Sequence, residues 1–97
     1  MIYWKGAEII IQIQYYGSIR TAAGKSEEQM ELGPEITVYQ LLRRLAPNDE
    51  IFVNENIRED VTVLLNGTII DHAETFEIIL GPDDVISLLP IFPGGGT

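Results

Sequence analysis

Cysteine is absent from the sequence, and its absence removes several kinds of chemistry. It excludes disulfide bonds, thiolate zinc sites and a cysteine nucleophile, so we expect packing alone to hold the fold. Basic residues are scarce: six Lys and Arg stand against fifteen Asp and Glu, giving a formal net charge of −9. A surface of this charge repels nucleic acid and anionic lipid and favours a basic partner surface. We therefore expect neither nucleic acid nor a membrane among its partners.

Long apolar runs are also missing. No run approaches the roughly 18 residues typical of a membrane-spanning helix. The N-terminal stretch MIYWKGAEIIIQIQ lacks the charged region, apolar core and cleavage site of a secretory signal, so we expect a cytoplasmic protein. The 97 residues fit a single domain. We expect an N-terminal extension over residues 1–8, one folded domain over residues 9–91 and a flexible glycine-rich tail over residues 92–97.

The N-terminal part of the predicted domain has the pattern of a β-hairpin. Residues 9–16, with the sequence IIIQIQYY, alternate from Ile11 onward and place Ile11, Ile13 and Tyr15 on one face. The stretch between Gly17 and Gly24 is turn-like, and residues 26–32 return with alternating character. We expect a first strand, a loop and a second strand.

A helix signal follows. Thr37 is a good N-cap, Gln40 completes a capping box with it, and Pro47 ends the run. Apolar residues at helical spacing form one stripe, which consists of Val38, Leu41, Leu42 and Leu45. Residues 48–60 are polar and mixed, which predicts a long loop with a brief helical or extended piece near residues 51–53.

The C-terminal part contains two more strand signals. Residues 61–65 are β-branched and apolar, the Asn-Gly pair at residues 66–67 is a strong hairpin turn signal, and residues 68–70 form a short return strand. Residues 81–84 (GPDD) make a turn, and residues 85–90 form a final apolar strand.

Two hairpins that flank one helix, with a last strand able to lie beside the first, predict a β-grasp fold. This is an α+β fold in which a mixed sheet of four to five strands packs on one main helix. Another small α+β sandwich with a different strand order has the same pattern. The expected core consists of Ile11, Ile13, Tyr15, Val38, Leu41, Leu42, Leu45, Val63, Leu65, Ile86 and Leu88.

Motifs with catalytic or metal-binding chemistry are weak. Residues 24–26 (GKS) resemble the end of a phosphate loop, but Ile19 stands where that loop needs a glycine. His72 has no second histidine or cysteine to share a metal, so a loop histidine is the better interpretation. The acid pairs at residues 27–28 and 83–84 fit solvation of a turn or an edge strand. We expect no metal site, no bound cofactor and no catalytic group in the folded part.

The end of the chain is more informative. Its glycines follow the last apolar strand directly, without a polar linker. Six extended residues span about 20 Å at roughly 3.3 Å each, and glycines pass through a slot that bulkier residues cannot enter. Such a tail can deliver its carboxylate into the active site of another protein.

Four segments together carry a family resemblance. They are residues 9–24 (IIIQIQYYGSIRTAAG), residues 64–67 (LLNG), residues 83–90 (DDVISLLP) and the pair Gly94-Gly95. In combination they resemble the MoaD family, the small sulfur-carrier subunits of molybdopterin synthase, within the wider MoaD/ThiS ubiquitin-like group. The likeness extends over residues 9–95, and its specificity lies in the combination rather than in any one motif.

The resemblance implies a sulfur carrier without catalytic groups of its own. An E1-like enzyme, using ATP and magnesium, adenylates the terminal glycine carboxylate and converts it to a thiocarboxylate. The large subunit of molybdopterin synthase then uses this sulfur on a pterin precursor. Gly94 and Gly95 match the terminal pair, with Gly95 as the thiocarboxylate carrier. Family members commonly end at this pair, so Gly96 and Thr97 would have to be removed before activation.

The resemblance also implies a partner-binding patch on the exposed face of the sheet. The expected patch consists of Tyr16, Ile69, Leu89 and Pro90. If the strand boundary is shifted, Leu89 is a core residue instead. Two alternatives to the molybdopterin role remain open. One is a thiazole-type sulfur carrier or a ubiquitin-like protein modifier, and the other is a β-grasp module that binds its partners non-covalently.

Overall fold

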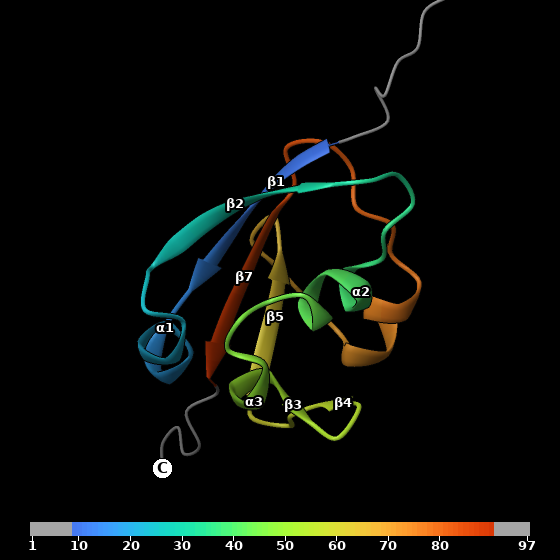
Figure 1. The fold of residues 1–97 in the computed structure, drawn as a ribbon. Coiled ribbons are helices and arrows are strands. Elements are labelled where there is room, and N and C mark those ends of the chain that lie inside the picture. Colours follow the sequence, from blue (N-terminus) through green and yellow to red (C-terminus); the bar gives the residue numbers. More distant parts are fainter. Residues whose placement is uncertain (1–8, 91–97) are drawn as a thin grey trace, which may run out of the picture.

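A computed structural model describes residues 9–90 of the chain. A five-stranded sheet with the order β2-β1-β7-β5-β6 forms its framework (Figure 1). The strands are β1 (Ile9–Tyr15), β2 (Glu27–Leu32), β5 (Val61–Leu65), β6 (Thr68–Ile70) and β7 (Val85–Pro90). The central pair β1 and β7 is parallel, whereas every other neighbouring pair is antiparallel. The sheet is therefore mixed, and its topology is the predicted β-grasp.

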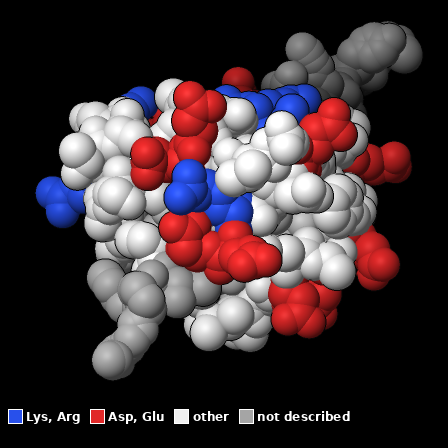
Figure 2. Space-filling model, turned by 90° about the horizontal axis from the view of Figure 1, so that it is seen from below, with Lys and Arg blue, Asp and Glu red and all other residues white. Residues whose placement is uncertain are grey.

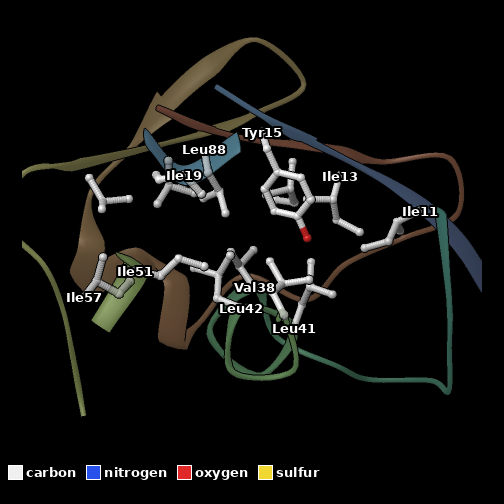
Figure 3. Packing of buried hydrophobic residues seen from close by; sticks show 14 of the residues in the cluster. Ile11, Ile13, Tyr15, Ile19, Val38, Leu41, Leu42, Ile51, Ile57 and Leu88 are labelled. Carbon is white, nitrogen blue, oxygen red and sulfur yellow. The ribbon is translucent and has the colours of Figure 1, made fainter. Parts of the chain in front are cut away.

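Short helices and a small hairpin complete the fold. They are α1 (Gly17–Ala23), α2 (Val38–Arg43), α3 (Asn48–Ile51), the 3-10 helix η2 (His72–Phe76), and a two-stranded sheet of β3 (Phe52–Val53) and β4 (Asn56–Ile57). Figure 3 shows Ile13 and Leu88 of the sheet facing Leu41 and Leu42 of α2 across the core. The core thus lies between one face of the sheet and the helices, and leaves the other face of the sheet outside.

The start of α2 follows the predicted capping box. The Thr37 hydroxyl accepts a hydrogen bond from the Gln40 backbone N–H at 3.1 Å, and the Gln40 side-chain oxygen accepts one from the Thr37 N–H at 2.9 Å. Two N–H groups that the first turn leaves without helical partners are thereby satisfied. The helix ends at Arg43, before Pro47, which caps α3 instead.

Most of the predicted core is confirmed. The confirmed residues are Ile11, Ile13, Tyr15, Val38, Leu41, Leu42, Leu45, Val63, Ile86 and Leu88. Leu65 is only partly buried, since it lies at the end of β5 beside the turn. Further buried residues, which the sequence pattern did not predict, are Ile19, Leu32, Ile51, Phe52, Ile57, Val61, Ile70 and Leu80.

The loop predicted between Gly17 and Gly24 is wrong, because these residues form α1. Both glycines have positive φ, +59° and +76°, and they bound the helix rather than a turn. Gly24 is a left-handed C-cap whose N–H donates to the Arg20 carbonyl at 3.0 Å. Ile19 is the one buried residue of α1, so the helix has too little apolar periodicity to be detected from sequence.

The long loop predicted over residues 48–60 is also corrected. The brief helical and extended piece expected there is a larger unit, made of α3 and the β3–β4 hairpin. Ile51, Phe52 and Ile57 turn inward and add to the core. The Tyr39 hydroxyl donates to the Glu55 carbonyl at 2.6 Å and so fixes this hairpin to α2.

The predicted hairpin turn at residues 66–67 is confirmed. Asn66 and Gly67 both have positive φ, 52° and 86°, as the type I′ geometry of two-residue hairpins requires. The Asn66 side chain also accepts from the Val85 N–H and donates to the Asp84 carboxylate, both at 2.9 Å. These bonds join the β5–β6 turn to the start of β7.

Candidate partner-binding face and the exit of the last strand

The outer face of the sheet is the surface that the predicted function would use. Register and alternation place its residues, which are Ile10, Gln12, Gln14, Glu27, Gln29, Glu31, Thr62, Leu64, Ile69, Val85, Ser87 and Leu89. We call this set the outer sheet face. Each member alternates with a residue that points to the core or to the core side of an edge strand.

The outer sheet face is divided by polarity. Glu27 and Glu31 lie on β2 at one edge, and the side-chain amide of Gln12 donates to Glu27 at 2.8 Å. Leu64 and Ile69 lie opposite each other on β5 and β6 at the other side. The face therefore offers a partner an acidic edge and an apolar half.

A polar group of side chains lies where β1 and β7 meet. The Gln14 side-chain oxygen accepts from the Ser87 hydroxyl at 3.1 Å and from the Tyr16 hydroxyl at 3.3 Å. Ser87 is buried, so this hydrogen bond satisfies a hydroxyl that water reaches poorly. The Tyr16 ring is held along the face at the end of β1, where its exposed fraction is 44%.

Three of the four predicted patch residues lie on or next to the outer sheet face. Ile69 is 69% exposed, Tyr16 follows the last residue of β1, and Leu89 is partly buried on β7. Leu89 alternates with the buried Leu88, so it belongs to the outer face and not to the core. Whether these residues bind a partner stays a prediction.

Pro90 lies differently. It pairs with the buried Val61, which places it on the core side of β7, and it is partly buried. Its ring faces Gly17 at the start of α1. Pro90 is also the last described residue, so Gly94 and Gly95 lie outside the described part of the chain.

Leu64 belongs to the apolar half and was not among the predicted patch residues. The signal was present, because Leu64 alternates with Val63 in the predicted strand, and the structure pairs it with Ile69. The hydrogen bond between Gln14 and Ser87 has no local sequence signal, because it depends on the parallel pairing of two strands at opposite ends of the chain.

Perturbed acid–base groups lie away from this face. The Tyr15 phenol is buried and donates to the Glu28 carboxylate; burial first, and then that hydrogen bond and charge, raise its pKa. Arg58 and Asp60 form an exposed ion pair at 3.0 Å, which raises the pKa of Arg58 and lowers that of Asp60. Both arrangements join neighbouring segments of the chain.

The weak motifs have structural roles. His72 Nε2 lies 2.7 Å from the Val61 carbonyl oxygen, a contact that ties η2 to β5. Gly24 is the C-cap of α1. Within residues 9–90, no group of His, Asp and Glu side chains is placed to hold a metal ion. No helix in that range is long and apolar enough to span a membrane.

The charge of the chain is visible on the surface. Figure 2 shows the end of the molecule that lies lowest in Figure 1, where acidic side chains surround a few basic ones. With a formal net charge of −9 on 97 residues, a basic partner surface is favoured.

Comparison with known proteins identifies the family. The ThiS family model matches residues 13–95, a range that begins inside β1, includes β2, β5, β6 and β7, and extends to the glycine pair at Gly94 and Gly95. The chain therefore belongs to the ThiS family, within the MoaD/ThiS ubiquitin-like group of sulfur carriers and modifiers. No curated protein matches the chain.

Solved structures agree with the fold. Small archaeal modifier protein 1 from Methanosarcina acetivorans is 26% identical, with a TM-score of 0.70 over 93% of this chain and 100% of that one. The protein of the same name from Haloferax volcanii is 17% identical, with a TM-score of 0.75 over 87% and 99%. A Pyrococcus furiosus protein described as molybdopterin converting factor, subunit 1, is 24% identical, with a TM-score of 0.67 over 87% and 99%.

Proposed function

We propose that this protein is the small, sulfur-carrying subunit of a molybdopterin synthase. The proposal rests on one observation above all: the family match extends to Gly95, beyond a central strand, β7, that ends beside the apolar half of the outer sheet face. The glycine pair at the end of that match is the feature that a carrier of this kind needs. The likeness to the Pyrococcus furiosus protein supports the molybdopterin assignment.

In the proposed reaction, Gly95 carries the reacting group as the terminal residue. One oxygen of its carboxylate attacks the α-phosphorus of ATP, and pyrophosphate leaves with its bond to that phosphorus broken. Hydrosulfide delivered in the activating enzyme then attacks the acyl carbon, the bond from that carbon to the AMP oxygen breaks, and a thiocarboxylate remains after the S–H proton is lost. The activating enzyme supplies ATP, magnesium and the donor, because this chain has no cysteine to supply sulfur.

The outer sheet face supplies the binding energy in this scheme. Leu64, Ile69 and Leu89 form its apolar half, Tyr16 lies next to it at the end of β1, and together they would fit an apolar partner groove. Because one face serves both the activating enzyme and the large synthase subunit, the two partners compete for it. The carrier must therefore leave the first before it binds the second.

A second candidate is supported by a specific likeness. Small archaeal modifier protein 1 from Methanosarcina acetivorans shares more identity with this chain than the Pyrococcus furiosus protein does. A modifier would end by transferring its acyl group to an amine of another protein, with the activated terminus consumed in an amide bond. A molybdopterin subunit would transfer sulfur and recover its carboxylate.

The test compares a chain that ends at Gly95 with one that ends at Thr97. Each is given the E1-like enzyme, ATP, magnesium and a sulfur donor, and adenylate formation and intact mass are followed. We expect a thiocarboxylate on the Gly95 form alone, because Gly96 and Thr97 would push the carboxylate past the reacting position. Equal formation on both forms would remove the processing requirement. Formation on neither would contradict sulfur carriage and favour the non-covalent module.

The last step decides between the two carriers. The thiocarboxylate form is mixed with the large synthase subunit and a pterin precursor, or with acceptor proteins. Sulfur on the pterin supports the molybdopterin role. An amide-linked conjugate in place of a sulfurated pterin supports the modifier.

A further inference from the structure

An unusually close contact joins Gly17, the first residue of α1, to Pro90, the last residue of β7. A Cβ atom added to Gly17 would lie 2.5 Å from Pro90 Cγ and 2.9 Å from Pro90 Cδ. Carbon atoms in favourable contact are about 3.5–4.0 Å apart. Only glycine fits at this position without a displacement of Pro90.

A Cβ atom at residue 17 would displace the backbone of Pro90 as well as its side chain. The proline ring is bonded to its own backbone nitrogen, so it cannot rotate away as a flexible side chain can. The three nearest atoms to the added Cβ all belong to Pro90, and no core atom is among them. The collision would therefore displace the end of β7 rather than a core side chain.

Neighbouring contacts hold α1, the element that contains Gly17, in place. The Tyr16 N–H donates to the Leu88 carbonyl at 3.0 Å, and α1 is anchored by the buried Ile19. Gly17 has a φ of +59°, which turns the chain sharply from β1 into α1. Figure 1 shows α1 beside the C-terminal end of β7.

We propose that Gly17 is a positioning residue for the glycine tail. By letting α1 pack directly on the Pro90 ring, it sets the point and the direction in which the chain leaves the sheet. The inference rests on the proposed function, in which the Gly95 carboxylate must reach a reacting atom in the activating enzyme. Five extended residues beyond Pro90 reach at most about 17 Å, so the position of Pro90 bounds where the Gly95 carboxylate can lie.

The expected effect is on chemistry rather than on binding. Gly17 has no side chain to offer a partner, and Leu64 and Ile69 lie on β5 and β6, away from its contact with Pro90. In a chain that ends at Gly95, Gly17→Ala should lower the rate of adenylate formation at saturating activating enzyme about tenfold, since misplacement by about 1 Å costs up to 100-fold. The dissociation constant for the enzyme should change much less than this rate.

Gly24→Ala is the matched control. Gly24 lies at the other end of α1 with a φ of +76°, so alanine there meets the same backbone strain, but nothing lies within 4 Å of its added Cβ. The two variants differ in the contact with Pro90. An equal loss of adenylate formation in both would overturn the proposal, because the loss would then come from strain in α1.

A second substitution tests the contact itself. Pro90→Ala removes Cγ and Cδ and leaves Cβ, which is 3.9 Å from the added atom. Pro90→Ala should lower the adenylation rate modestly, and the double variant should recover to that level. A double variant as slow as Gly17→Ala alone would show that the loss does not pass through Pro90. A wild-type rate in Pro90→Ala would also count against positioning, whether or not Gly17→Ala folds.

One measurement is independent of the proposed function. The chain has no cysteine, so Gly94→Cys gives a single position for a nitroxide label on the tail. We expect the set of backbone amides broadened by this label to shift in Gly17→Ala and to match wild type in Gly24→Ala. Identical sets in both would overturn the positioning role. A shift in a protein that is never adenylated would keep that role and reject the proposed function.

Discussion

Ile69→Asp is the sharpest test of the outer sheet face. Ile69 lies on the edge strand β6, 69% exposed, opposite Leu64. Ile69 and Leu64 together form an exposed apolar patch, and contiguous apolar patches mark binding surfaces. The substitution should therefore leave the fold intact and remove the interaction.

The two magnitudes follow from the exposed fraction. Burial of a whole Ile side chain contributes about 1.5–3 kcal/mol, and roughly a third of this one is covered, so we expect a loss of stability of about 0.5–1 kcal/mol. In a domain of this size that lowers the thermal midpoint by about 2–8 °C. A carboxylate placed in a desolvated interface should cost binding at least about 2 kcal/mol, or roughly 30-fold in Kd.

Thr68→Asp provides the control. It adds the same charge on the same strand, but Thr68 pairs with Leu65 and so has the opposite parity from Ile69. Titration calorimetry with the activating enzyme and with the large synthase subunit gives the affinities, and thermal melting gives the stability. Equal weakening by both variants would mean that added charge alone matters, and unchanged binding of Ile69→Asp would place the interface elsewhere.

Three further predictions address the core, the buried phenol and the charge. Leu42→Ala should cost about 2–5 kcal/mol and lower the thermal midpoint by about 10 °C or more; an unchanged midpoint would contradict the packing of α2 on the sheet. Burial and Glu28 raise the pKa of Tyr15 above its ordinary 10.0, so above pH 10 the unfolded chain loses a proton that the folded protein keeps, and stability falls as pH rises. Tyr15→Phe should remove this part of the loss, measured by denaturant unfolding at about pH 9 and about pH 11, and an equal loss in both proteins would contradict it. With a net charge of −9, the association rate with the activating enzyme should fall as salt increases, and a flat response would exclude steering.

The elements that the sequence predicts are those whose signal lies in residues close together in the sequence. Alternation identifies β1 because its two faces meet different surroundings, and the Thr37–Gln40 capping box fixes the start of α2. Asn66 and Gly67 identify their hairpin because both residues tolerate positive φ. In each case neighbours in sequence carry the information.

The elements that sequence reasoning missed depend on distant contacts. In α1 only Ile19 is buried, and the helix is held by packing at the end of β7. Ile51 and Ile57 reach the core from a segment with no helical or strand period, because α3 and the β3–β4 hairpin are too short to repeat one.

The candidate site also has one part that the sequence predicts and one part that depends on distant contacts. Parity alone places Leu89 on the outer sheet face, and the structure agrees. The packing of Gly17 on Pro90 has no sequence signal, because it joins two residues at opposite ends of the described chain through the parallel pairing of β1 and β7.

The polarity of the outer sheet face would determine the orientation in which a partner binds and receives the tail. Leu89 precedes Pro90 at the exit, and the acidic residues Glu27 and Glu31 lie on the far edge, across β1. A partner with an apolar groove and a basic rim can satisfy both regions in one orientation only, since the reverse places carboxylates in the groove and leaves them unpaired. That orientation brings the groove next to the end of β7. The charge distribution of the sheet would then set where the partner lies relative to the end of β7, and the contact at Pro90 would set where the glycine tail starts. Both would determine where the tail enters the partner.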